Sequence, residues 1–448
     1  MDSVLKQISS VDSEVLAEYK ENVMVGGGSP GPCLVSGHGI RVNDLNGNSY
    51  IDCTSQSWAL YLGHTNKEIQ ECVYEHMNKL SHVHQGFDSQ ERASLAHKLA
   101  SLAPKHLNRV SFTVGGGPAI EAAMKIAMKN VPNAQTFINL WESYHGCTLT
   151  TAGASWTSTK SAGKYVGPSN YFLPNLNTNF VRVPNPYCYR CYFDQKCENC
   201  NMKCLEMLRH TLDMGAPGRV AGIIVEPIQA SGGQIPLPKK YVQGLREICD
   251  EYGCLLIFDE IQTYCRCGEF FAANYYDVEP DIIVLGKALG AGFPIAAIII
   301  HDRLKGFDMD AEELHTFANN SVSQVAALKQ IEIIERDNLL ENTRNVGAKI
   351  ANGLREMQKT YPEIGDIRQV GLHIGVEMID PATGAPLDVA TAAELKSTAM
   401  YKNGLILGTG GYKKHVLKIK PPMITTMEEA DEILEKFEAT LKMVLRKG

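Results

Sequence analysis

Short apolar runs that alternate with amphipathic stretches constrain this chain more than any other feature of its sequence. Runs rich in β-branched residues end at polar residues or glycine, and helical patterns such as Ala119–Lys129 and Lys240–Tyr252 separate them. Such runs are typical of buried strands. Strand and helix alternation over about 200 residues predicts an α/β fold with a mostly parallel sheet covered on both faces. The predicted strands are Val110–Val114, Phe137–Trp141, Val220–Val225, Leu255–Phe258, Ile282–Leu285 and Ile295–Ile300.

The two ends of the chain carry a different pattern. Residues 33–52 are typical of a hairpin with its turn at Asp44–Asn48, and a helical run over Val322–Arg336 precedes an α+β segment. The last helix begins at the capping-box pattern Thr426–Glu429. We therefore expect a large domain over residues 63–325 and a small α+β domain that combines 1–62 with 326–448.

Composition and charge exclude several classes of function. Of the 448 residues, 44% are hydrophobic and 21% are charged, which is typical of a globular chain and not of a disordered one. A net charge of -7 provides no basic surface of the kind that nucleic acid requires. The apolar runs fall well short of the roughly 20 residues that span a bilayer, and the first residues lack the apolar core of an export signal. We expect a cytoplasmic protein that binds neither nucleic acid nor membrane.

Thirteen cysteines are an unusual feature for such a protein, and five of them lie between residues 188 and 204. In a cytoplasmic protein we expect reduced thiols. The spacing Cys-x2-Cys-x5-Cys-x2-Cys-x3-Cys fits a zinc or iron–sulfur site, reduced structural thiols or a disulfide, and the three alternatives stay open. A metal held by these thiolates would be structural, because no coordination position would remain open. The five residues are Cys188, Cys191, Cys197, Cys200 and Cys204.

Polar residues follow several predicted strands, at the edge where open parallel sheets bind ligands. The glycine-rich segment 115–117 opens a helix, which fits a phosphate cradle or only a tight turn. Asp259 and Lys287 each close a strongly apolar run, where an unpaired charge is costly. Alone, each could mark the point where a strand meets solvent.

Together these residues indicate a specific chemistry. A lysine amine at the mouth of a sheet can form a Schiff base with an aldehyde. Pyridoxal phosphate (PLP) uses such a lysine, with an acidic residue at its ring nitrogen, a phosphate cradle and an aromatic ring on its face. Lys287, Asp259, the glycines and Tyr144 supply these four requirements, so the sequence predicts a PLP site.

The chain resembles class III pyridoxal-phosphate-dependent aminotransferases of fold type I along nearly its whole length. The motifs agree with that family in both order and spacing. The matching stretches are Asp44–Asp52, Gly63-His64, Tyr144-His145-Gly146, Glu226–Gln229, Phe258–Thr263, Gly286-Lys287, Thr316-Phe317 and Lys420–Pro422.

The resemblance implies roles for these residues and an oligomeric state. Lys287 would be the Schiff-base lysine and proton carrier, Asp259 the partner of the pyridine nitrogen, and Gln262 the partner of the ring oxygen. Tyr144 would stack on the ring, and Glu226 would lie near the substrate face. A homodimer or homotetramer is implied, with sites at the interface. The other implied cofactor contacts are Gly115, Gly116, Gly117, His145 and, from the neighbouring subunit, Thr316.

Three departures from the family concern the substrate and the phosphate. The phosphate loop reads Val114–Ala119 in place of the usual Asn-Ser-Gly-Ser-Glu-Ala, so a hydroxyl contact is lost and the backbone N–H groups remain. Lys418 stands where many members carry a carboxylate-binding arginine, and lysine offers a point charge in place of a planar fork. The stretch Thr263–Gly268 is one residue shorter than the family's Thr-Gly-Phe-Gly-Arg-Thr-Gly. Its Arg266 would orient a carboxylate or brace its loop, and Trp58 would narrow the substrate pocket or pack in the core.

The predicted function is transfer of an amino group between an amino acid or amine and a 2-oxo acid, with anionic substrate groups held by Lys418 or Arg266. A racemase or epimerase is the alternative on the same scaffold, and a lyase acting on a phosphorylated or phosphonate amine is another. A non-catalytic cofactor- or metal-binding protein is the alternative from a different class. Retention of the full set argues against that last alternative; the set is Lys287, Asp259, Gln262 and Tyr144.

Overall fold

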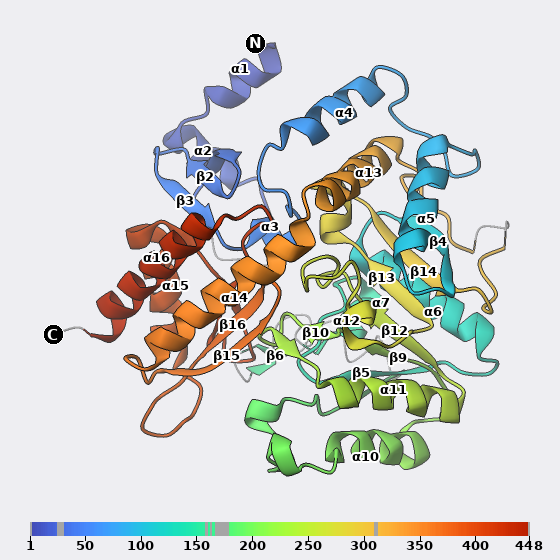
Figure 1. Ribbon diagram of the computed structural model, residues 1–448. Helices are drawn as coiled ribbons and strands as arrows, with labels where there is room; N and C mark the ends of the chain where they lie inside the picture. The colour runs from blue at the N-terminus through green and yellow to red at the C-terminus, as the bar shows by residue number, and fades with distance from the viewer. Residues whose placement is uncertain are drawn as a thin grey trace.

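A seven-stranded sheet forms the centre of the larger lobe in the computed structural model, which describes residues 2–24, 31–156, 160–161, 164–165, 179–308 and 312–446 (Figure 1). Neighbouring strands from β13 to β8 pair in parallel, and β14 runs against both of its neighbours. The mostly parallel sheet and all six predicted strands are confirmed. In spatial order the strands are β4 (Leu107–Thr113), β14 (Ala296–His301), β13 (Ile282–Leu285), β12 (Leu255–Asp259), β9 (Val220–Val225), β5 (Thr136–Leu140) and β8 (Phe180–Val183).

Both faces of this sheet are covered, which explains why its strands are apolar without alternation. Along β12, Ile257 packs in a core with the apolar face of α6 (Gly116–Asn130). The next residue, Phe258, faces the opposite core with residues of α11 (Lys239–Tyr252). Successive side chains on a strand point to opposite faces, so each strand must be apolar throughout.

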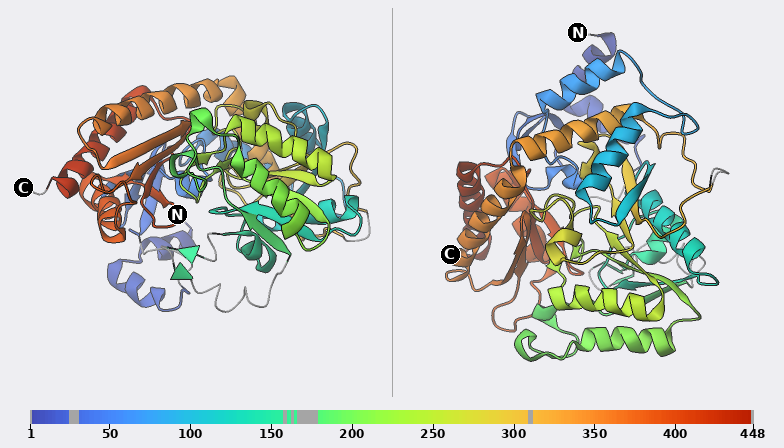
Figure 2. Two further views of the ribbon diagram at one scale, coloured as in Figure 1. Left: turned by 90° about the horizontal axis from the view of Figure 1, so that it is seen from below. Right: turned by 45° about the vertical axis from the view of Figure 1, so that its right-hand side comes forward.

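The smaller lobe joins the two ends of the chain. Strand β3 near the N-terminus pairs in parallel with β17, so Ile51 lies opposite Leu405. Figure 2 shows the N-terminal strands and the C-terminal elements together on one side of the large sheet. The domain limits given above stay a prediction. The elements are β1 (Leu34–His38), β2 (Arg41–Asp44), β3 (Ser49–Asp52), α14 (Leu339–Gln358), β15 (Ile364–Val370), β16 (His373–Met378), α15 (Val389–Asn403), β17 (Leu405–Ile406), β18 (Gly408–Gly410), β19 (Val416–Ile419) and α16 (Met427–Leu445).

Two local predictions concern how these elements begin. Helix α16 begins at the predicted capping box, in which the Thr426 side chain accepts from the Glu429 N–H and the Glu429 side chain accepts from the Thr426 N–H. The predicted turn at residues 44–48 closes the β2–β3 hairpin, with Asp44 Oδ1 accepting the Asn46 and Asn48 N–H groups. Local side-chain chemistry therefore sets both features, as the sequence predicts.

The remaining helices surround the two lobes. Helix α13 (Ser321–Arg336) packs on α4 and α5 beside the large sheet. In the described ranges, no helix is both long enough and apolar enough to cross a membrane. The other elements are α1 (Ser3–Ser9), α2 (Ser13–Lys20), α3 (Ser55–Trp58), α4 (Lys67–Met77), α5 (Gln90–Leu102), α7 (Leu149–Ala154), β6 (Lys160–Ser161), β7 (Lys164–Tyr165), α10 (Lys203–His210), β10 (Ile228–Gln229), β11 (Ile235–Pro236) and α12 (Ala272–Tyr276).

Candidate active site

The ends of the central strands meet at one cavity of about 270 Å³. Strand β12 ends at Asp259, β13 is followed by Lys287, and Glu226 comes directly after β9. These parallel strands place their carboxyl ends at the same edge of the sheet, so the three charged side chains converge. Nine of the residues predicted to contact the cofactor or act in catalysis line the cavity, namely Gly115, Gly116, Gly117, Tyr144, His145, Glu226, Asp259, Gln262 and Lys287.

The first part of the cavity is the start of helix α6. Gly115 is its N-cap and provides no side-chain hydrogen bond, so the first N–H groups of the helix are open to an anion. The backbone at Gly117 also lies close to the neighbouring loop, because a Cβ there would lie 2.9 Å from Thr148 Cγ2. The glycine-rich segment therefore lies at the cavity with its backbone exposed to it, and its role as a phosphate cradle stays a prediction.

Lys287 supplies an amine without a partner. In the described part of the chain its Nζ makes no hydrogen bond or ion pair, and its backbone has a φ of 45°, in the left-handed region. Burial lowers the pKa of Lys287, and the charges of Asp259 and Glu226 act in the opposite direction. A lysine with a lowered pKa has a larger neutral fraction and is a better nucleophile and base.

The two carboxylates beside Lys287 are held in different ways. Asp259 Oδ2 lies 2.8 Å from His145 Nδ1, and Asp259 Oδ1 accepts the Ile261 N–H at 3.2 Å. Glu226 accepts the Tyr144 N–H at 2.9 Å and the Ala230 N–H at 3.0 Å. Glu226 thus fixes the loop that carries Tyr144, while Asp259 presents a charge that His145 orients.

Two buried lysines lie beside Trp58, on β19 and at the residue after it, and none of these three residues is among those that line the cavity. Lys418 Nζ is 4.4 Å and Lys420 Nζ 4.8 Å from the centroid of the Trp58 ring, and both lysines are buried. Burial, together with the nearby charges of Lys414 and Lys287, lowers the pKa of Lys418 to about 7, and the charge of Glu226 acts in the opposite direction. Lys420 also donates to Gln262 Oε1 at 3.1 Å.

The sequence indicates Lys418 and Trp58 for the substrate pocket, but it gives Lys420 only as part of the Lys420–Pro422 motif and assigns it no role. Residues two apart on a strand point to the same face, so the period of two from Lys418 was a usable signal. His373 was also missed: its Nε2 lies 2.9 Å from the Gln262 carbonyl oxygen, and its position on β16 gives no signal in the sequence.

The structure corrects the prediction for Arg266 as a carboxylate ligand. Its side chain is fully buried and does not line the cavity. The guanidinium donates to the Pro421 carbonyl at 2.7 Å and to Ser55 Oγ at 3.2 Å, and it lies 4.4 Å from the centroid of the Tyr61 ring. Arg266 therefore braces its loop, which is the other role that the sequence allowed.

Thr316 lies outside the cavity of its own chain. Its side chain is exposed, in the segment that precedes α13. Its predicted contact with the phosphate of a neighbouring subunit stays a prediction.

The predicted metal site is not supported. The five clustered cysteines do line one cavity of about 320 Å³, and burial together with Cys197 raises the pKa of Cys188 to about 12. However, no three of their sulfur atoms come within 4.8 Å of one another, whereas a tetrahedral thiolate site brings all of its sulfurs together. In the described ranges, one set of three potential ligands has its ligand atoms within 4.8 Å of one another, and it consists of His106, His301 and Asp302.

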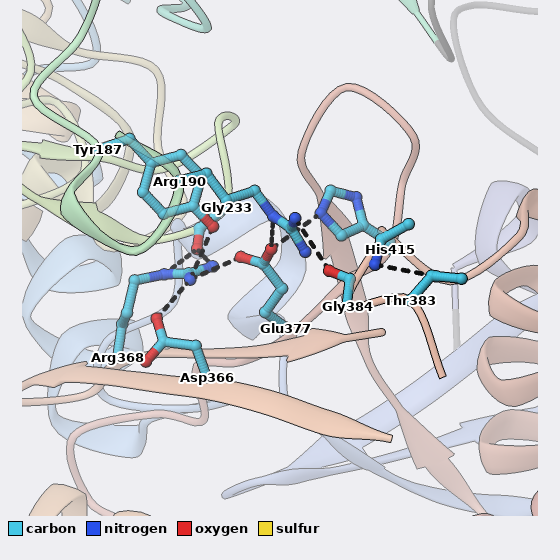
Figure 3. Close-up of polar contacts among 10 residues, drawn as sticks. Tyr187, Arg190, Gly233, Asp366, Arg368, Glu377, Thr383, Gly384 and His415 are labelled. Atoms are coloured by element: carbon cyan, nitrogen blue, oxygen red, sulfur yellow. Dashed lines mark hydrogen bonds and ion pairs between the residues drawn. The ribbon is translucent and has the colours of Figure 1, made fainter. Parts of the chain in front are cut away.

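The cysteine-rich segment instead contacts the smaller lobe through charged side chains, shown in Figure 3. Arg190, between Cys188 and Cys191, donates to Glu377 on β16. Glu377 also accepts from Arg368 at 2.7 Å, and Arg368 donates to the Tyr187 hydroxyl at 2.9 Å. These hydrogen bonds and ion pairs therefore connect the cysteine-rich segment to the smaller lobe, and none of them requires a metal.

The cavity fits PLP. It combines an unpaired lysine, a buried carboxylate for a ring nitrogen, N–H groups at a helix start for a phosphate, and a tyrosine ring. Among the described residues, His145 Nε2 is buried with no hydrogen-bond partner, which a bound group could explain, because buried polar atoms are normally paired.

Comparisons with known proteins agree with this geometry. The family model described as aminotransferase class-III matches residues 27–441. The isoleucine 2-epimerase of Lentilactobacillus buchneri is 31% identical over 89% of this chain and 87% of its own length. The taurine–pyruvate aminotransferase of Bilophila wadsworthia is 30% identical over 92% of each chain.

Among solved structures, an amine transaminase from an uncultivated Pseudomonas species, in its PLP-bound form, superposes with a TM-score of 0.85. It is 25% identical, and the match covers 95% of this chain and 99% of that one. The fold is therefore fold type I, and the chain belongs to the class III aminotransferase family.

Proposed function

We propose that this protein binds PLP at Lys287 and transfers an amino group between an amino acid or amine and a 2-oxo acid. The observation that carries the proposal is the unpaired Lys287 amine in one cavity with Asp259 and the open start of α6. The PLP-bound solved structure and the aminotransferases among the relatives support it.

The residues that would hold the cofactor divide its parts among them. The N–H groups at Gly116 and Gly117 would hold the phosphate, and Asp259 would pair with the ring nitrogen. Gln262 would pair with the ring oxygen, and Tyr144 would stack on the ring face. When bound, PLP supplies an electron sink that stabilises negative charge on the amino-bearing carbon of the substrate.

The chain itself supplies the proton transfers. Lys287, with its lowered pKa, would take the proton from the amino-bearing carbon and, for amino transfer, would give it up as an acid at the cofactor and not at the carbon from which it came. Asp259 would pair with the ring nitrogen, and His145, whose Nδ1 lies 2.8 Å from Asp259 Oδ2, holds that carboxylate in place. Lys418 offers its charge to an anionic group of the substrate, and the indole of Trp58 excludes water beside it.

We also infer a homodimer with Thr316 reaching the partner's site. Beside Thr316 lies an exposed apolar surface with Phe317 59% and Leu314 55% exposed. The 80–87 segment adjoins it, because Gln85 Nε2 donates to the Glu313 carbonyl and Phe87 is 68% exposed. Such a surface favours burial against a second subunit. The thirteen free thiols support a reducing compartment such as the cytoplasm.

Reconstitution with PLP tests the proposal. The purified chain should gain visible absorbance near 420 nm and convert a 2-oxo acid to an amino acid in the presence of a donor from an amine panel. Lys287→Ala should lose the covalent linkage, assayed by borohydride trapping and mass spectrometry. Lys442→Ala, on the exposed side of α16, is the matched control. Retention of the trapped adduct in Lys287→Ala would refute the assignment.

Racemisation or epimerisation is the second candidate, because a relative 31% identical is named an epimerase and Lys418 lacks the fork that grips a carboxylate. The two reactions share proton removal and differ in where the proton returns. Incubation of single-enantiomer amino acids in deuterium oxide without a 2-oxo acid separates them. Deuterium incorporation with loss of optical purity, without stoichiometric conversion to a 2-oxo acid, would favour the racemase.

A further inference from the structure

The Gln262 side chain lies between the cavity and a buried lysine. Gln262 lines the cavity with Asp259 and Lys287. Its Oε1 accepts a hydrogen bond from Lys420 Nζ at 3.1 Å, and both side chains are buried. Its Nε2 has no hydrogen-bond partner in the described part of the chain.

The chemistry of an amide makes this contact informative. A side-chain amide has one oxygen that only accepts and one nitrogen that only donates, and a protonated lysine has three N–H donors and no acceptor. An amide turned by 180° would set its N–H₂ against the N–H groups of Lys420. The contact with Lys420 therefore selects the orientation in which Nε2 is free to face the cavity.

Lys420 is itself held firmly in place. Its N–H donates to the Cys53 carbonyl at 2.9 Å, and its carbonyl accepts from Ser55 Oγ at 2.9 Å. The Trp58 ring lies against its amine, with 4.8 Å between Nζ and the ring centroid. The backbone of Gln262 is fixed too, since its main-chain carbonyl accepts a hydrogen bond from the Tyr61 hydroxyl at 3.2 Å.

We propose that Lys420 is a positioning residue that fixes the amide of Gln262 so that Nε2 donates to the ring oxygen of the cofactor. The inference rests on the proposed PLP function and adds to it a residue outside the expected cofactor set. Lys420 does not touch the cofactor, and its effect passes through one hydrogen bond.

The readout is the pKa of the linkage between Lys287 and PLP, taken from visible absorbance against pH. A donor on the ring oxygen weakens the hold of that oxygen on the linkage proton, so it lowers this pKa. Lys420→Met, which keeps the length of the side chain and removes its donors, should raise the pKa by about one pH unit. Gln262→Leu should raise it similarly.

Loss of a nearby positive charge would also raise this pKa, so a double-mutant cycle separates the two effects. In the Gln262→Leu background, Lys420→Met should add less than about 0.3 pH unit, because the amide that it orients is gone. Lys418→Met is the matched control, since Lys418 is a second buried lysine beside Trp58 that does not contact Gln262. The shift in linkage pKa caused by Lys418→Met should be the same with Gln262 present and in the Gln262→Leu background.

Two results would overturn the inference: no shift in Lys420→Met, or an equal shift with and without Gln262. If Lys420→Met does not fold, Lys420→Gln tests the same point, because it keeps an N–H donor and loses the charge. In Lys420→Gln, the pKa of the linkage between Lys287 and PLP should lie within about 0.3 unit of the parent value. A shift as large as that expected for Lys420→Met would show that only the charge of Lys420 matters. If the parent protein gains no visible absorbance with PLP, the proposed function itself fails.

Discussion

His145 Nδ1 lies 2.8 Å from Asp259 Oδ2, and both side chains are buried at the end of the central sheet. Asp259 is the only strand-end carboxylate of the cavity that has an imidazole partner, whereas Glu226 is held by backbone N–H groups. The pair places a hydrogen-bonded, oriented charge where a ring nitrogen would lie.

Removal of the imidazole should weaken the site without abolishing it. We expect His145→Ala to lower kcat/KM about ten- to hundred-fold, because a hydrogen bond to a charged group contributes about 1.5–3 kcal/mol. Asp259→Asn should cost more, since it removes the charge itself. Steady-state kinetics of both variants and of the double variant check this. The double variant should match Asp259→Asn alone, and independent multiplicative losses would contradict a joint role.

Substitution of Gly117 should destabilise the chain even without cofactor. A Cβ there would lie 2.9 Å from Thr148 Cγ2, and Thr148 cannot retreat easily because it caps α7 and donates to Glu121. We expect Gly117→Ala to lower the free energy of unfolding by about 1–3 kcal/mol. Denaturant unfolding of cofactor-free protein measures this.

Gly115 offers the matched comparison. A Cβ at Gly115 meets only Pro118 Cδ at 4.0 Å, and the extended φ of -174° suits any residue. Gly115→Ala should therefore change the free energy of unfolding by less than about 0.5 kcal/mol. Equal losses in the two variants would show that the close approach at Gly117 is not what limits its substitution.

The sequence predicts Asp259 and Lys287 together because their positions follow from strand ends alone. Carboxyl ends of parallel strands share one edge of the sheet, so residues 28 positions apart in sequence must converge once the strands are recognised. The motif resemblance adds the roles. Neither step requires knowledge of side-chain packing, which is why this part of the site is predictable.

The backbone conformation around Trp58 could not be predicted from the sequence. Residues 55–58 have φ values of 46°, 48°, 60° and 67°, and each non-glycine residue in that region costs roughly 1–2 kcal/mol. The backbone preferences of these residues oppose such a turn, and hydrogen bonds from other parts of the chain stabilise it. Asp52 accepts the Thr54 and Gln56 N–H groups, and Arg266 reaches Ser55 from 211 positions along the chain. No local pattern in the sequence encodes this arrangement.

The role of Arg266 as a brace leads to a distinct kinetic prediction. Arg266→Lys should lower the melting temperature, because lysine cannot reproduce the contacts with both Pro421 and Ser55. Since the guanidinium is fully buried and already engaged by Pro421 and Ser55, kcat/KM for acidic and for neutral donors should change by the same factor. A selective loss for acidic donors would restore Arg266 as a substrate ligand.

Lys418 should make the preference for acidic substrates depend on pH. Its pKa of about 7 lies below the ordinary value of 10.5, so the side chain is charged below pH 7 and loses its charge as the pH rises through 7. Affinity for an anionic substrate group should therefore fall between about pH 6 and 8, by roughly tenfold if the ion pair contributes about 1.4 kcal/mol. The ratio of kcat/KM for an acidic donor to that for a neutral amine, followed against pH, isolates this effect from the titration of the donors' amines.

Lys418→Arg provides the control, because arginine stays protonated throughout this range and grips a carboxylate through two N–H groups. The ratio should become independent of pH in this variant and should not fall below the acidic limit of the parent. Lys418→Met should give a low ratio at every pH. If the parent ratio is flat from pH 6 to 8, the charge of Lys418 does not select the substrate, and the anionic group is held elsewhere.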